Sequence, residues 1–147
     1  MYFEDLKIGD AVHTDGVPIC RADMVAFAEK YDPLPLHMDE DFAKTTRFGT
    51  LIAPGVMAFM SVWAAYLRKG DFCGEQVIAG KSTRVEWFLP VFDGDVLTGD
   101  VRITGLTPRN AYNGAVEITV DIRNQKGELV MCDVTEAIVA RRGAEEP

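Results

Sequence analysis

The chain has 147 residues, of which 48% are hydrophobic and 26% charged, and it carries a formal net charge of −8 at pH 7. That composition is typical of a globular protein, and the length predicts a single domain with a substantial core over residues 1–147. The negative charge argues against nucleic acid as a partner, because nucleic-acid binding depends on a cationic face.

The first half of the chain predicts one strand followed by helices. We expect the strand over Ala11–Val17, where His13 receives no role because a lone strand histidine is usually a surface residue. Apolar residues at helical spacing predict a helix over Arg21–Tyr31, which Pro33 ends. Asp39 is then expected to cap the N-terminus of a second, short helix.

The segment Val56–Leu67 is apolar throughout, apart from one serine and a tyrosine hydroxyl. A helix that is apolar on all sides is either enclosed by protein or lies in a bilayer. Counted from Leu51, the apolar run has 17 residues, fewer than the roughly 20 that a bilayer span requires, and Pro54-Gly55 interrupts it. We therefore expect a buried central helix and no membrane partner.

From residue 74 onward the hydrophobic pattern changes from a period of 3.6 to a period of 2, which predicts antiparallel strands. Apolar residues alternate through Ser82–Leu89 and Val116–Arg123, and a longer polar connection is expected over Thr107–Gly114. Together the elements predict an α+β fold in which a curved antiparallel sheet wraps around the central helix. The apolar sides of two further strands are assigned to Val101 and Ile103, and to Val130, Cys132, Val134 and Ile138.

The cysteines Cys20, Cys73 and Cys132 are widely spaced and include no Cys-x-x-Cys pair. They indicate neither a metal site nor a disulfide framework, so we expect reduced thiols. The N-terminal residues are acidic where a signal peptide would be basic and then apolar. The sequence thus predicts a cytoplasmic protein.

The chemistry is concentrated around Asp32, His37 and Pro54-Gly55. A carboxylate and an imidazole beside a shared water can move protons in both directions. A helix N-terminus offers backbone N–H groups to a developing oxyanion. Five residues turn a helix by about 140° and a polyproline spiral by about 120°, so the segment must curve for the two side chains to meet. The spacing alone leaves open an ordinary loop with a surface histidine.

One run of residues resembles the signature of the MaoC-like family, the (R)-specific enoyl-CoA hydratases and related acyl dehydratases of hot-dog fold. The matching residues are Asp32-Pro33-Leu34-Pro35-Leu36-His37, Asp39, Ala43, Phe48-Gly49 and Ile52-Ala53-Pro54-Gly55. The resemblance implies a hydro-lyase of fatty acid metabolism that reversibly hydrates a trans-2-enoyl-CoA, with coenzyme A entering only as part of the substrate. It also implies a homodimer, or a multiple of dimers, with the acyl tunnel along the interface.

The same resemblance assigns the site. Asp32 and His37 are the expected acid and base, in an order that the sequence leaves open, and the Gly55 amide is the expected oxyanion donor. Substrate-binding residues are expected at Pro54, Leu34, Phe48, Trp63 and Arg84.

Several of these positions carry open questions. Leu34 replaces an asparagine of the family pattern, and Trp63 replaces a serine that assists in the best-known hydratases. Trp63 either shortens the acyl pocket or packs in the core. The coenzyme A phosphates require a basic patch, for which the candidates are Lys81, Arg84, Arg102 and Arg109, although a solvated strand face explains each of them equally.

Two alternatives remain at this point. A hot-dog thioesterase needs a carboxylate, a water and an oxyanion site but no histidine five residues later, so the spacing of Asp32 and His37 favours the hydratase. A non-catalytic subunit that binds acyl thioesters is consistent with Leu34 and Trp63.

Overall fold

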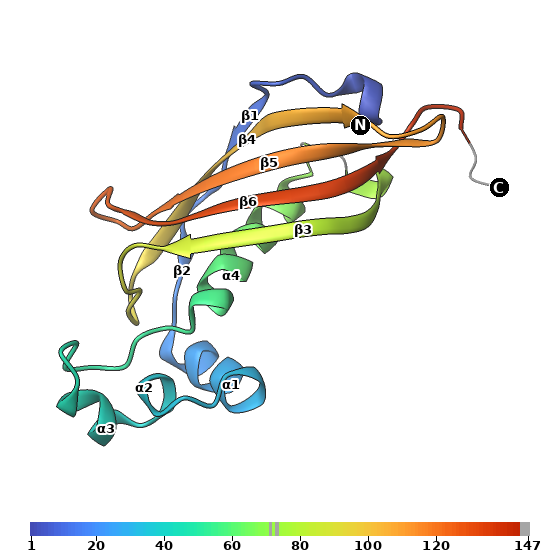
Figure 1. Ribbon diagram of the computed structural model, residues 1–147. Coiled ribbons are helices and arrows are strands. Elements are labelled where there is room, and N and C mark those ends of the chain that lie inside the picture. Colours follow the sequence, from blue (N-terminus) through green and yellow to red (C-terminus); the bar gives the residue numbers. More distant parts are fainter. Residues whose placement is uncertain (71, 73, 145–147) are drawn as a thin grey trace.

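The computed structural model describes residues 1–70, 72 and 74–144. Its strands form an antiparallel sheet in the order β1-β4-β5-β6-β3, and β2 pairs with β4 outside this path. A long helix crosses one face of the curved sheet, so the expected α+β architecture is confirmed (Figure 1). The strands are β1 (Ala11–His13), β2 (Val17–Pro18), β3 (Val77–Trp87), β4 (Val96–Pro108), β5 (Asn113–Arg123) and β6 (Leu129–Ala140).

The long helix, α4 (Gly55–Lys69), begins directly after Pro54 and ends at Gly70, whose φ of 74° gives the left-handed cap. One side of α4 packs on the sheet through Met57, Ala58, Phe59, Val62 and Tyr66. The prediction that the helix is enclosed on all sides is wrong. The exposed fractions of Val56, Met60 and Leu67 are 51%, 47% and 50%, because the sheet covers only one side. None of the described helices is long and apolar enough to cross a bilayer.

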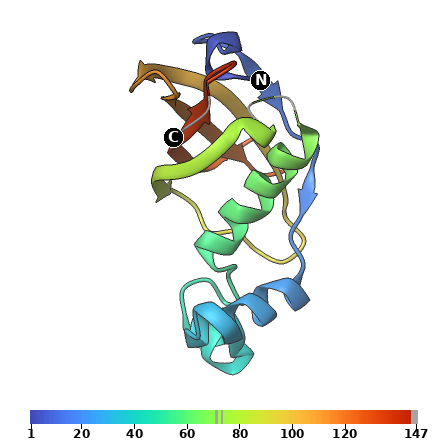
Figure 2. The same cartoon turned by 90° about the vertical axis from the view of Figure 1, so that its right-hand side faces the viewer.

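Three short helices form a cluster beyond one end of α4, as Figure 1 and Figure 2 both show. They are α1 (Arg21–Tyr31), α2 (Pro35–Met38) and α3 (Glu40–Thr45). The predicted bounds of α1 are confirmed. The predicted cap of α3 is also confirmed, since the Asp39 carboxylate accepts a hydrogen bond from the Phe42 amide at 3.1 Å.

Three predicted strand boundaries differ from the structure. The expected strand Ala11–Val17 is divided into β1 and β2, and between them the buried Thr14 hydroxyl accepts a hydrogen bond from the Gly99 amide at 2.8 Å. The polar connection expected over Thr107–Gly114 shortens to residues 109–112, because β4 and β5 remain paired up to Pro108 and Gly114. The strand expected over Ser82–Leu89 is β3, which begins earlier and ends at Trp87.

The inner face of β6 contains two polar residues. Asp133 and Thr135 are only 0% and 7% exposed, whereas Cys132 and Val134 are half-buried. The assignment of Cys132 and Val134 to the apolar side is therefore wrong. The Thr135 hydroxyl lies 2.9 Å from each Asp133 carboxylate oxygen and donates to that carboxylate, so the buried acid has a partner that the apolar pattern does not reveal.

Cys20 and Cys132 are free thiols, and Cys73 lies outside the described residues. Burial raises the pKa of the Cys132 thiol to about 11, so this thiol is protonated at neutral pH.

Candidate active site

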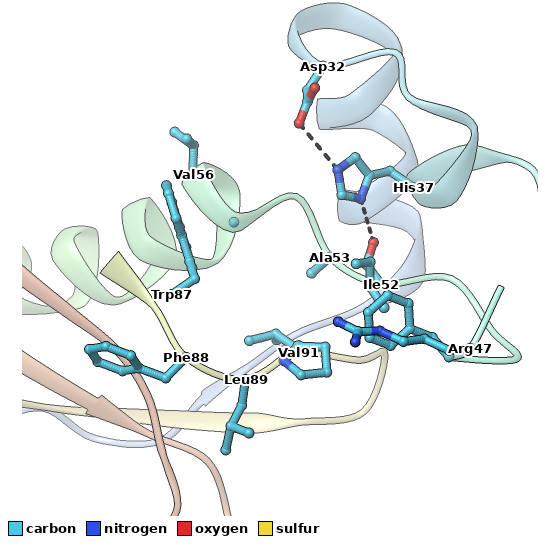
Figure 3. A pocket seen from close by; sticks show the side chains of 13 residues that line it. Asp32, His37, Arg47, Ile52, Ala53, Val56, Trp87, Phe88, Leu89 and Val91 are labelled. Atoms are coloured by element: carbon cyan, nitrogen blue, oxygen red, sulfur yellow. Dashed lines mark hydrogen bonds and ion pairs between the residues drawn. The ribbon is translucent and has the colours of Figure 1, made fainter. Parts of the chain in front are cut away.

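The turn between α1 and α2 brings Asp32 and His37 together. Asp32 ends α1, where its amide still donates to the Ala28 carbonyl at 2.9 Å. Pro35 then begins α2, because its fixed φ suits the first helical position and its missing N–H is not needed there. His37 lies in this short helix and its ring turns back toward Asp32 (Figure 3). The curve that the five-residue spacing requires is thus made by a helix end, a short extended link and a new helix.

Both ring nitrogens of His37 have partners, and the residue is only 6% exposed. Nδ1 lies 2.7 Å from the Ile52 carbonyl oxygen, and Nε2 lies 3.3 Å from Asp32 Oδ2. Because a carbonyl oxygen only accepts, Nδ1 must carry a proton. His37 can therefore exchange a proton with other groups only at Nε2, on the side of Asp32.

The Asp32 side chain is 39% exposed, so the carboxylate is open to water while the histidine beside it is nearly enclosed. An imidazole nitrogen and a carboxylate are both groups that can accept or donate a proton. The pair is therefore suited to accept a proton from a bound water and to donate one to a substrate, as general acid–base chemistry requires.

Gly55 is the first residue of α4 and lies in the same cavity as Asp32 and His37. The first amides of a helix have no carbonyl acceptor within it, and the dipole makes this end favourable for negative charge. A Cβ atom at Gly55 would lie 2.6 Å from the Trp87 ring atoms Cε2 and Nε1, so the indole packs directly on this helix start. A side chain at this position would therefore push the indole and the start of α4 apart.

The structure has two adjoining cavities on this side of the molecule. The catalytic cavity, about 420 Å³, contains Asp32, His37 and Gly55. The apolar cavity, about 760 Å³, lies between α4 and β3. Val56 and Trp87 line both, so the two spaces meet at the start of α4 (Figure 3).

The predicted site residues divide among these spaces. Phe48 lines the catalytic cavity together with Asp32, His37 and Gly55. Trp63 lines the apolar cavity, where its ring contacts Phe59 and Tyr66 with centroid distances of 5.9 and 5.1 Å.

The other predicted residues lie outside both cavities. Pro54 is buried and precedes the first residue of α4 without lining either space. Leu34 is 47% exposed, and the Arg84 side chain is 75% exposed on β3, so neither reaches a cavity wall.

Several residues that line the catalytic cavity are not among the predicted site residues, and Arg47 is the charged one among them. Its guanidinium lies 4.8 Å from the centroid of the Phe48 ring. The position of Arg47 directly before Phe48, which was assigned to the site, was the available signal.

Among residues 1–70, 72 and 74–144, no group of three or more His, Cys, Asp or Glu side chains is arranged to hold a metal ion. The groups at hand for chemistry are the His37–Asp32 pair and the amide of Gly55. Arg47 adds a positive charge to the cavity lining.

An antiparallel sheet packed on one long helix, with a histidine–carboxylate pair beside the helix start, defines a hot-dog protein of the hydratase and dehydratase kind. A family model described as MaoC like domain matches residues 5–125. The chain therefore belongs to the MaoC-like family.

Individual relatives agree with this assignment. The chain is 31% identical over 112 residues to an (R)-specific enoyl-CoA hydratase from Rhodospirillum rubrum, covering 76% of this chain and 75% of the relative. A crystal structure of a MaoC-like dehydratase from Rhodospirillum rubrum superimposes with a TM-score of 0.87, at 29% identity and with 98% and 99% of the two chains covered. An (R)-hydratase from A. caviae superimposes with a TM-score of 0.70, at 30% identity and with 94% and 98% covered.

Proposed function

We propose that this protein catalyses the reversible addition of water to a trans-2-enoyl-CoA, giving the (3R)-hydroxyacyl thioester. One observation carries the proposal: His37 is held between the Ile52 carbonyl and Asp32, in a cavity that also contains the first residue of α4. The similarity to an (R)-specific enoyl-CoA hydratase supports the substrate class and the configuration at C3.

The pair activates water and returns a proton. A water between Nε2 of His37 and the Asp32 carboxylate attacks C3, and one of the two groups takes its proton as the C–O bond forms. The electrons of the C2–C3 double bond move toward the thioester oxygen and form an enolate. The other group of the pair, which carries a proton at the outset, gives that proton to C2. The proton taken from water then passes between the two groups and restores the starting state, so that one water has been added in total. Positioned proton transfer of this kind contributes about 10²- to 10⁴-fold in rate.

The negative charge on the enolate oxygen must be stabilised by a hydrogen-bond donor that is already in position. The Gly55 N–H, at the positive end of α4, is the group that we assign to it. Removing one such donor in other enzymes costs about 10²- to 10³-fold in kcat. The scheme uses only side chains, a backbone amide and water.

We further propose that the active form is a homodimer or a multiple of dimers. β3 is an edge strand, and unpaired edges are normally covered in soluble assemblies. Beside it, Val56, Met60 and Leu67 of α4 expose apolar surface that a second copy would cover. The free thiols Cys20 and Cys132 fit a reducing compartment such as the cytoplasm.

The test follows two signals from one reaction. Short, medium and branched trans-2-enoyl-CoAs are mixed with the protein, and loss of the conjugated chromophore is recorded together with release of free thiol. We expect chromophore loss without thiol release. Thiol release would instead identify a thioesterase, and binding without either signal would identify a non-catalytic subunit.

A further inference from the structure

Arg47 is a cation without an acidic partner at the catalytic cavity. Within the described part of the chain, no carboxylate forms an ion pair with it, and its recorded contact is the stacking on Phe48. Stacking occupies the flat face of a guanidinium and leaves the N–H donors at its edge available. The exposed Arg47 side chain thus lines the cavity, and it forms no hydrogen bond with another residue among those that the structure describes.

Neighbouring cations on the helices are already engaged. Arg21 pairs with Glu40, and Lys44 lies 4.0 Å from Asp41. The basic residues of the sheet are no better placed. None of the sheet residues Lys81, Arg102 and Arg109 lines the catalytic or the apolar cavity. Each also has a partner: Lys81 pairs with Glu136, Arg102 with Asp121 at 2.8 Å, and Arg109 donates to Asn113 at 3.1 Å.

The positions of the two cavities indicate how a bound thioester is oriented. An apolar acyl tail fits the larger cavity, whose wall is made mostly of aliphatic and aromatic side chains. That cavity joins the catalytic one at Val56 and Trp87, and Figure 3 shows Arg47 away from this junction, next to Ile52. A thioester that reacts at His37 with its tail in the apolar cavity therefore leaves its carrier on the side of Arg47.

We propose that Arg47 binds a phosphate group of the carrier to which the acyl group is attached. This inference rests on the proposed function, because it takes the orientation of the thioester from it. A protein with a net charge of −8 repels a phosphorylated substrate at long range, so a local cation is needed at the mouth of the site. A guanidinium is suited to the task because its donors match the oxygens of a phosphate in pairs.

The experiment compares a CoA thioester with its pantetheine counterpart, whose carrier lacks all three phosphates together with the adenosine. KM and kcat are measured with trans-2-butenoyl-CoA and with trans-2-butenoyl-pantetheine, which lacks phosphate, for the wild type, Arg47→Gln and Arg47→Lys. Arg68→Gln is the matched control, since Arg68 is an exposed arginine in the last turn of α4. In Arg47→Gln we expect KM for the CoA ester to rise about tenfold with kcat unchanged, the scale of one charge-assisted hydrogen bond near solvent.

The phosphate-free ester should react equally well with the wild type and Arg47→Gln, and Arg47→Lys should recover part of the loss. Equal losses with both esters, or no loss with either, would overturn the role of Arg47. Equilibrium binding of butanoyl-CoA and butanoyl-pantetheine is measured in parallel, because these saturated esters cannot be hydrated. If the protein lacks turnover but Arg47→Gln selectively weakens butanoyl-CoA, the proposed hydration fails and the assignment of Arg47 stands.

Discussion

The molecule contains two histidine–aspartate pairs, one on the sheet and one at the start of the long helix. On the sheet, Nδ1 of His13 lies 2.6 Å from Asp100, and the two side chains are 62% and 53% exposed. In the catalytic cavity, Nε2 of His37 lies 3.3 Å from Asp32, and the histidine side chain is only 7% exposed. The pair with the shorter separation is therefore the more exposed one. Distance between the two side chains does not identify the reactive pair.

The two pairs differ in their surroundings. The hollow beside His13 is lined only by residues of β1 and β4, among the residues that the structure describes. The cavity beside His37 contains the start of α4, and the Ile52 carbonyl fixes which ring nitrogen carries a proton. A nearly enclosed imidazole, a defined tautomer and a nearby helix N-terminus are the features that suit the His37 pair, and not the His13 pair, to the proposed catalysis.

The largest effect is expected when the two side chains of each pair are replaced in turn. His37→Ala and Asp32→Asn should each lower kcat/KM by about 10²- to 10⁴-fold, because positioned proton transfer is lost. His13→Ala and Asp100→Asn are the matched controls and should stay within twofold of the wild type. The rates are measured from loss of the enoyl chromophore, with circular dichroism to verify folding. A loss in the His13 and Asp100 variants equal to that in the cavity variants would show that the catalytic pair has been assigned wrongly.

A smaller effect is expected from Gly55→Ala. The added Cβ would lie 2.6 Å from the Trp87 ring, and because Trp87 is 47% exposed the clash can be relieved by shifts of both the indole and the start of α4 without unfolding the protein. Displacement at the start of α4 should lower kcat about 10- to 100-fold, since misplacing a reactive group by about 1 Å has effects of this order.

The cause is checked with a double-mutant cycle. In a Trp87→Ala background the clash is absent, so Gly55→Ala should reduce kcat far less than it does alone. Equal reductions in both backgrounds would show that the contact with Trp87 is not the cause.

Much of this site follows from the sequence because it depends on local residues. The prolines around Asp32 and His37 predict a rigid turn, and the apolar run after Pro54-Gly55 predicts a helix whose first amides lie near it. The pairing of His37 with the Ile52 carbonyl was not predictable, since it joins residues through a tertiary contact that leaves no periodic signal.

Two errors have the same origin. Arg84 was predicted to bind substrate, but its side chain is 75% exposed on β3. Arg47 was not predicted, and only the folded chain shows that it lines the catalytic cavity. On β6, alternation of hydrophobicity assigned Cys132 to the core, whereas Asp133 is the buried residue because Thr135 satisfies its carboxylate. Patterns record the average preference of a residue type, and a specific buried partner overrides that preference.

Asp133 provides a third carboxylate for comparison, because it is 0% exposed and its side-chain partner is the Thr135 hydroxyl. Burial raises its pKa from 3.8 to about 6, and the hydrogen bond from Thr135 offsets only part of that effect. The folded protein therefore holds this proton more tightly than the unfolded chain does. Stability contributed by the protonated form is present at low pH and is lost as the pH rises from about 4 through 6.

Asp133→Asn should remove this dependence. Between pH 5 and pH 7.5 the wild type should lose about 1 kcal/mol of unfolding free energy that the variant does not lose, equivalent to a shift of about 3 °C in Tm. Thermal unfolding of both proteins across this range measures the difference, and the other carboxylates cancel because both proteins contain them. Parallel Tm curves would mean that Asp133 stays charged in the folded state across the range. One hydrogen bond from a hydroxyl would then be enough to keep a buried carboxylate ionised.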